Sequence, residues 1–136
     1  MPKTPLLAVD VVAIIDDGVV LIRRANPPYE GFYALPGGFV EYGERVEDAA
    51  LREMLEETGL EVRLKALIGV YSDPSRDPRG HVVSIAYLAD VVGGALKPAT
   101  DAKEAKVFPI GNIPEKLAFD HEQILKDAFK ILRKSS

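Results

Sequence analysis

Short apolar runs separated by turn residues divide the chain into predicted strands. Two valine-rich runs, 6–15 and 19–22, flank Asp16-Asp17-Gly18, a combination typical of a hairpin turn. Further strands are predicted at 38–42, at 60–71 (as one strand or two), at 82–92 before Gly93-Gly94, and at 106–110. Between 72 and 81 the sequence is polar and has no periodicity, which predicts a loop.

Two segments have the period of an amphipathic helix instead. One covers about 120–132, with apolar residues at Ile124, Leu125, Ala128, Phe129 and Leu132. The other is predicted over 46–58, with Gly59 in the left-handed position that commonly ends a helix. At its start, Val46 stands where we expect a capping Ser or Thr. Strands on both sides of one helix, plus a terminal helix, predict an α+β fold in which a mixed β-sheet packs between helices.

Composition narrows the functional classes. The 136 residues predict one domain, spanning 1–136, with 47% apolar and 28% charged residues as in ordinary globular proteins. The sequence has no cysteine, which excludes disulfides and thiol chemistry. A net charge of −4 argues against a general nucleic-acid partner. No signal peptide or membrane-length apolar run is evident, so we expect a cytoplasmic protein with no membrane partner.

The helix predicted over 46–58 carries three carboxylates on one face. At about 100° per residue, Glu56 and Glu57 lie at about −60° and +40° from Glu53. Leu51 and Leu55 project from the opposite side. Converging carboxylates suit a hard divalent cation such as Mg²⁺, which prefers oxygen ligands. The alternative is a glutamate-rich face that only meets solvent.

The loop before this helix favours the metal-binding alternative. Leu35-Pro36-Gly37-Gly38 provides a backbone that a ligand can approach closely. Together with the helix it fills every fixed position of the Nudix box, at Gly38, Glu44, Arg52, Glu53, Met54, Glu56, Glu57, Gly59 and Leu60. The chain therefore strongly resembles a Nudix hydrolase, which implies an α/β/α sandwich.

The resemblance also implies roles for individual residues. It implies that Glu53, Glu56, Glu57 and the Gly37 carbonyl are metal ligands. Arg52 is expected to orient the neighbouring carboxylates and Glu44 to anchor the loop to the helix, although either residue could be a plain salt-bridge partner. For the general base, Glu53 is one candidate, and a carboxylate of a later loop, Asp101 or Glu104, is the other. The alternative for Glu104 is an acid that only faces solvent.

Two further segments are similar to small ADP-ribose pyrophosphatases: the loop 72–81 with its Pro74, and Leu117-Ala118-Phe119-Asp120-His121. Arginines suit phosphate oxygens because a guanidinium matches phosphate geometry. The candidates are Arg76 and Arg79 in the loop and Arg23 or Arg24 at the end of a strand. Candidates to stack an adenine ring are Tyr29, Phe32, Tyr33 and Phe119. Solvated arginines and aromatic core residues are the ordinary alternatives.

These observations lead to one functional hypothesis. We expect a Mg²⁺-dependent hydrolase that splits ADP-ribose, a small nucleoside diphosphate substrate, into AMP and ribose 5-phosphate. The sequence leaves Mg²⁺ and Mn²⁺ both open, and the resemblance is compatible with a homodimer. The competing hypotheses are a pyrophosphatase acting on nucleoside triphosphates or other nucleoside diphosphate derivatives, and a sensor that binds ADP-ribose without cleaving it.

Overall fold

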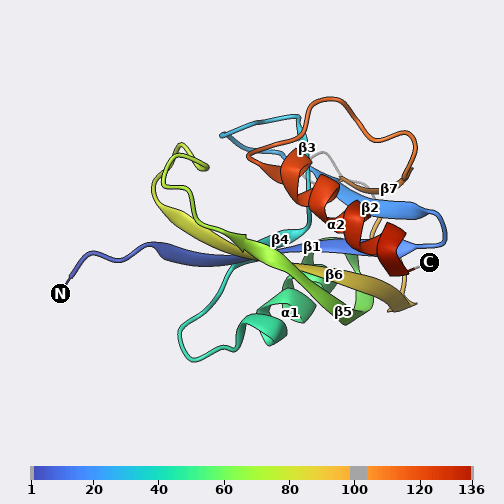
Figure 1. The fold of residues 1–136 in the computed structure, drawn as a ribbon, viewed down its shortest axis with the longest axis horizontal. Helices are drawn as coiled ribbons and strands as arrows, with labels where there is room; N and C mark the ends of the chain where they lie inside the picture. The colour runs from blue at the N-terminus through green and yellow to red at the C-terminus, as the bar shows by residue number, and fades with distance from the viewer. Residues whose placement is uncertain (1, 99–103, 136) are drawn as a thin grey trace.

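The computed structural model describes residues 2–98 and 104–135. Within those residues, seven strands and two helices follow one another along the chain (Figure 1). They are β1 (Leu6–Ile15), β2 (Gly18–Arg23), β3 (Tyr33–Ala34), β4 (Gly37–Phe39), α1 (Val46–Thr58), β5 (Leu60–Tyr71), β6 (Val82–Gly94), β7 (Glu104–Pro109) and α2 (His121–Ser135).

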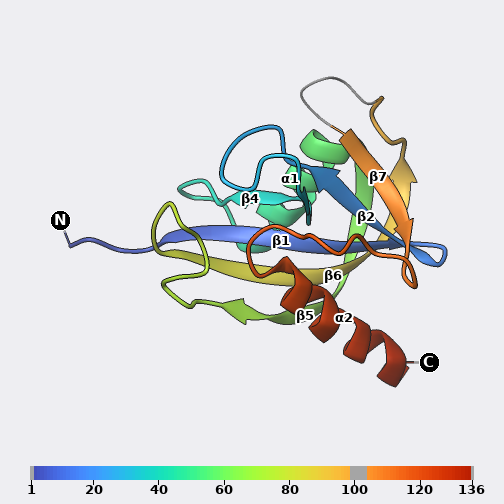
Figure 2. The same cartoon turned by 90° about the horizontal axis from the view of Figure 1, so that it is seen from above.

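The strands form one mixed sheet around β1. This strand runs parallel to β6, from Leu6 beside Val82 to Ile14 beside Asp90, and antiparallel to β4, with Asp10 opposite Gly37. Figure 2 shows β1 lying between β4 and β6. β5 pairs with the outer edge of β6, while β2 carries β3 and β7. Because β4 leads directly into the loop before α1, this pairing brings that loop to the middle of the sheet.

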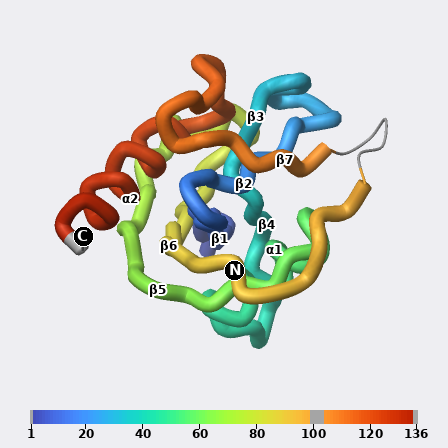
Figure 3. Tube along the Cα trace, turned by 90° about the vertical axis from the view of Figure 1, so that its right-hand side faces the viewer, coloured from blue at the N-terminus to red at the C-terminus, as the bar shows by residue number. Residues whose placement is uncertain are grey.

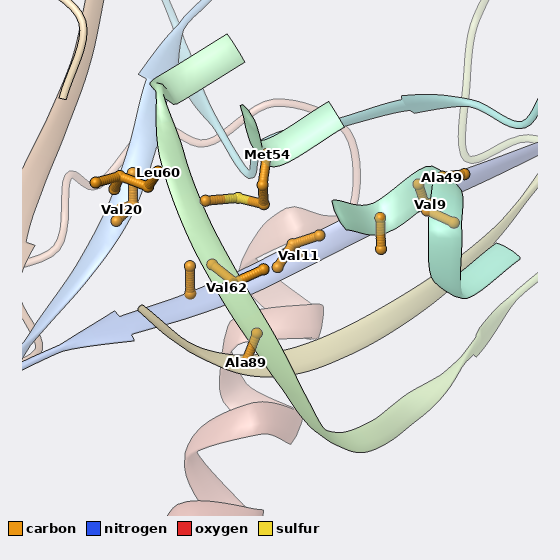
Figure 4. Packing of buried hydrophobic residues seen from close by; sticks show 10 residues of the cluster. Val9, Val11, Val20, Ala49, Met54, Leu60, Val62 and Ala89 are labelled. Atoms are coloured by element: carbon orange, nitrogen blue, oxygen red, sulfur yellow. The ribbon is translucent and has the colours of Figure 1, made fainter. Parts of the chain in front are cut away.

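The two helices cover opposite faces of the sheet (Figures 1 and 3). Successive side chains of a strand point to opposite faces, so β1 contributes to two cores. Val9 and Val11 pack with Met54 of α1, and Figure 4 shows this cluster. Val12 packs with Ile124 and Leu125 of α2. The predicted α/β/α sandwich is therefore confirmed.

Most predicted elements are confirmed, and α1 has the predicted bounds. Gly59 ends it in the left-handed conformation (φ 81°), with its N–H bonded to the Leu55 carbonyl. The capping position belongs to Arg45, one residue before the expected one, and its side chain makes no capping hydrogen bond. The segment 60–71 is one strand with irregular register, and β6 continues through Gly93 and Gly94 because Gly94 pairs with Leu60.

Two leucines of α1 lie outside the core. Leu51 and Leu55 are 40% and 49% exposed, whereas Ala49, Ala50 and Met54 are fully buried. The core side of α1 therefore lies beside the carboxylate face and not opposite to it. Among the described residues, no helix is long and apolar enough to cross a membrane.

Candidate active site

The segment Leu35–Gly38, called the glycine turn below, meets the carboxylate face of α1. The Gly37 N–H donates a hydrogen bond of 2.7 Å to Oε1 of Glu57. A Cβ atom on Gly38 would lie 2.5 Å from the carboxyl carbon of Glu53, and one on Gly37 would lie 2.1 Å from the Val9 carbonyl oxygen. Position 37 therefore requires glycine because the neighbouring strand is too close, whereas a side chain at position 38 would displace the Glu53 carboxylate.

Arg52 links the loop before α1 to the carboxylates of that helix. Its guanidinium makes two hydrogen bonds to the Glu44 carboxylate, of 2.7 and 3.0 Å. It also donates to Glu53 at 2.7 Å, to Glu56 at 3.2 Å and to the Phe39 carbonyl at 3.2 Å. Glu44 in turn accepts the backbone N–H of Glu41. This geometry agrees with the orienting and anchoring roles expected for Arg52 and Glu44.

The charges in this network shift the pKa values of two carboxyls in opposite directions. Hydrogen bonding to Arg52 lowers the pKa of Glu44 to about 2. Burial raises the pKa of Glu53, with Glu56 and Glu44 adding to the effect and Arg52 opposing it. Negative charge at Glu53 is therefore only partly compensated by the protein, which favours a nearby cation.

The carboxylates have the chemistry of a divalent-metal site but are not gathered into one. Among the described residues, no three histidine or acidic side chains stand close enough to hold a metal ion. Glu53 and Glu56 are turned to Arg52, and Glu57 to the Gly37 N–H. All the donors are hard oxygens on one side of the glycine turn, which fits Mg²⁺.

A cleft opens beside the glycine turn. It has a volume of about 100 Å³, and Gly37, Gly38, Glu57, Arg24 and Arg79 are among its lining residues. The guanidinium carbons of Arg24 and Arg79 lie 5.0 and 5.5 Å from the ring centre of Phe119. Burial, together with the charge of Arg79, lowers the pKa of Arg24. Two cations held beside one ring suit an anionic ligand.

A second hollow, of about 160 Å³, brings Glu104 close to the same site. Glu57, Glu104, Arg23 and Arg24 are among the residues that line it. Glu104 lies on β7 opposite Arg23 and accepts a 2.6 Å hydrogen bond from the Tyr33 hydroxyl. This bond is the main cause that raises the pKa of Tyr33. Glu104 is therefore not an acid that only faces solvent. The other candidate base, Asp101, lies outside the described residues.

Several aromatic candidates and Arg76 have other partners. Tyr29 packs edge-on against both Phe32 and Phe119, and Tyr33 packs against Phe108. Arg76 is only 5% exposed and makes two hydrogen bonds to Asp120, of 2.8 and 2.7 Å. Arg76 also lines the cleft, but its guanidinium is buried in this carboxylate pair. Arg79, by contrast, is 47% exposed and reaches the cleft, where Asp77 also pairs with it.

Three residues that line this cleft were not among the site residues predicted from sequence: Phe39, Asp10 and His121. Phe39 is 42% exposed, although it sits inside the recognised box. Asp10 is a charged residue in the middle of an otherwise apolar strand, and that interruption is a signal that could have identified it. His121 ends the segment 117–121, and it accepts the Leu35 N–H.

An α/β/α sandwich that holds a carboxylate-bearing helix against a glycine turn is typical of hydrolases that use a divalent metal. The chain belongs to the Nudix family, since the sequence model of the NUDIX domain matches residues 4–128. Members of this family generally depend on a divalent metal.

Three relatives illustrate the range of functions. The chain is 58% identical to an ADP-ribose pyrophosphatase of Methanocaldococcus jannaschii over 90% of its own length and 72% of that protein. It is 33% identical to the ADPR responsive transcriptional repressor NtrR of Acinetobacter baylyi, over 93% of the chain and 54% of the repressor. The NUDIX domain of Shewanella oneidensis NrtR, solved with ADP ribose, superposes with a TM-score of 0.81 at 30% identity, covering 96% of this chain and 90% of that one.

Proposed function

We propose that this protein is a Mg²⁺-dependent pyrophosphatase that cleaves ADP-ribose to AMP and ribose 5-phosphate. The observation that carries the proposal is the meeting of opposite charges beside the glycine turn. Glu57 of α1 accepts the Gly37 N–H and lines the same cleft as Arg24 and Arg79. The 58% identity to an ADP-ribose pyrophosphatase supports the choice of substrate.

Glu53, Glu56, Glu57 and the Gly37 carbonyl would hold the metal. When bound there, Mg²⁺ supplies charge neutralisation and activates water for attack on phosphorus. Arg52 holds Glu53 and Glu56 in place, and Glu44 fixes Arg52 to the preceding loop. Arg24 and Arg79 bind the diphosphate oxygens, since both guanidiniums line the cleft next to Gly37 and Glu57.

Glu104 is the general base in this proposal. Its carboxylate shares a hollow with Glu57, and Tyr33 holds it by a hydrogen bond of 2.6 Å. Glu53, the other candidate, is already bonded to Arg52 and packed against Gly38, so it is better suited to metal binding. Kinetics at saturating Mg²⁺ test this choice: Glu104→Gln should lower kcat and leave metal affinity unchanged, whereas Glu53→Gln should weaken metal binding.

Phe39 is the residue we assign to the nucleoside. Its exposed ring lines both the cleft and a larger hollow of about 660 Å³, which residues 3–6 and 79–82 also line. Arg79 borders both spaces, so a diphosphate bound there would direct one end of the substrate toward Phe39. Phe39→Ala should therefore raise KM for ADP-ribose up to about tenfold, which corresponds to the loss of one aromatic contact of up to about 1.4 kcal/mol.

A non-catalytic sensor is the second candidate, favoured by the similarity to NrtR and NtrR. Incubation with ADP-ribose and Mg²⁺, beside nucleoside triphosphates, dinucleoside polyphosphates and NADH, separates the hypotheses. We expect AMP release from ADP-ribose, abolished by Glu57→Gln. Binding of ADP-ribose without any turnover would support the sensor, and turnover of another compound would reject the ADP-ribose assignment.

A further inference from the structure

The two segments that resemble ADP-ribose pyrophosphatases outside the box meet in one buried polar network. Arg76, from the loop after β5, pairs with Asp120 at the start of α2, and its guanidinium also lies 3.8 Å from Asp10 of β1. The Nε2 atom of His121 lies at a distance of 3.4 Å from the other carboxylate oxygen of Asp10. Neither the metal-binding carboxylates nor the phosphate-binding arginines belong to this network.

Asp10 lies where the fold otherwise places apolar side chains. It is 8% exposed and points to the α2 side of the sheet, where its neighbour two residues on is Val12. A buried carboxylate is costly unless it is paired and hydrogen-bonded. Ser84 donates a 2.5 Å hydrogen bond to it, and Arg76 and His121 complete its surroundings. Burial alone would raise the pKa of Asp10, but these partners together lower it, so the group is charged.

His121 connects this network to the glycine turn. The Leu35 N–H donates a 3.0 Å hydrogen bond to Nδ1 of His121. Nδ1 therefore carries a lone pair, and in the neutral ring the proton is on Nε2, facing Asp10. On the next residue, the Pro36 carbonyl accepts the Val11 N–H at 2.9 Å. The turn is thus fixed at Leu35 by His121, at Pro36 by Val11, and at Gly37 by Glu57.

We propose that His121 is a positioning residue for the proposed metal site. Through Nδ1 it holds the start of the glycine turn, so that the Gly37 carbonyl and Glu57 keep their mutual placement. Asp10 holds the tautomer that makes Nδ1 an acceptor. This inference rests on the metal site of the proposed function, and it assigns a role to a residue outside the proposed metal ligands.

Two substitutions distinguish the roles of the two ring nitrogens of His121. An asparagine carbonyl oxygen can take the place of Nδ1 and accept the Leu35 N–H, whereas a glutamine amide reaches the place of Nε2 and leaves Leu35 unpaired. We expect His121→Asn to bind Mn²⁺ within about threefold of the wild type and His121→Gln to bind it about tenfold more weakly. The measurement is the free Mn²⁺ signal in electron paramagnetic resonance, with thermal unfolding of each variant.

Ile124→Val serves as the control, because it perturbs the α2 core and leaves the turn contacts intact. A His121→Gln variant with wild-type Mn²⁺ affinity would overturn the proposal, as would His121→Asn binding as weakly as His121→Gln. An equal loss of Mn²⁺ affinity in Ile124→Val would also overturn the proposal. Wild-type protein that binds Mn²⁺ but does not turn over ADP-ribose would reject the proposed function and leave this test intact. A wild type that does not bind Mn²⁺ would remove the site on which the inference rests.

Discussion

Replacing Gly38 with alanine should move one carboxylate and leave the fold intact. The added Cβ would lie 2.5 Å from the carboxyl carbon and from Oε2 of Glu53, and these are the end of a side chain, not backbone. An ordinary contact begins at 3.4 Å, so the carboxylate must retreat by about 0.9 Å. Alanine also restricts the unfolded chain, which stabilises a protein by about 0.4–1 kcal/mol where the backbone conformation is compatible.

The Gly38→Ala substitution is therefore expected to lower activity and not stability. A misplacement of about 1 Å in a catalytic site can reduce the rate by about 10²-fold, equivalent to about 2.7 kcal/mol of transition-state stabilisation. We expect kcat/KM for ADP-ribose to fall by about that factor while the midpoint of thermal unfolding stays within a few degrees of the wild type. AMP release under saturating Mg²⁺ measures the first quantity, and calorimetry the second.

Two other glycines make the comparison specific. On Gly37 the new Cβ would lie 2.1 Å from the Val9 backbone carbonyl, so Gly37→Ala should lower the midpoint of unfolding as well as activity. Gly111→Ala meets no atom within 4 Å and should change neither. Full activity in a stable Gly38→Ala protein would refute the reasoning, because it would mean that the position of Glu53 against the glycine turn does not matter for turnover.

Three further outcomes test other parts of the structure. Arg52→Leu should raise the pKa of Glu44 from about 2 toward its ordinary value of 4.5, which a carboxyl-carbon NMR titration would detect; an unchanged pKa would contradict the pairing. Asp10 has a lowered pKa when folded, so it contributes stability above the unfolded value of 3.8 that is lost as pH falls through the folded value. Asp10→Asn should therefore flatten the loss of thermal stability below about pH 4, and parallel curves for both proteins would reject this assignment. Met54→Ala should cost about 2–5 kcal/mol in urea unfolding, against less than about 1 kcal/mol for Leu55→Ala, since only Met54 is fully buried; equal losses would contradict the core described for α1.

The features that sequence predicted well depend on local signals. α1 has the predicted bounds because Gly59 supplies the left-handed residue that ends it and acids occupy its first turn. The contact of Arg52 with Glu56 follows from helix geometry, since residues four apart are neighbours on a helix surface. Its contacts with Glu44 and Glu53 do not follow from that spacing.

The features that could not be predicted from the sequence depend on contacts between distant elements. The core side of α1 could not be assigned from α1 alone, because the strands β1, β5 and β6 determine which face of the helix is buried. Glu104 reaches the hollow that Glu57 lines through the pairing of β7 with β2, and the hydroxyl of Tyr33 holds it there. His121 acquires its role through Leu35, a backbone donor 86 residues away. None of these partners is visible in the local pattern.

The two arginines of the loop 72–81 show why residue type alone does not assign a phosphate ligand. Arg76 and Arg79 are three residues apart, yet one is 5% exposed against Asp120 and the other is 47% exposed beside Phe119. The buried pair joins the loop to the start of α2, and those same two segments supply Arg79 and Phe119 to the cleft. We therefore expect a weakened Arg76–Asp120 pair to displace Arg79, and to affect substrate binding through the position of the loop.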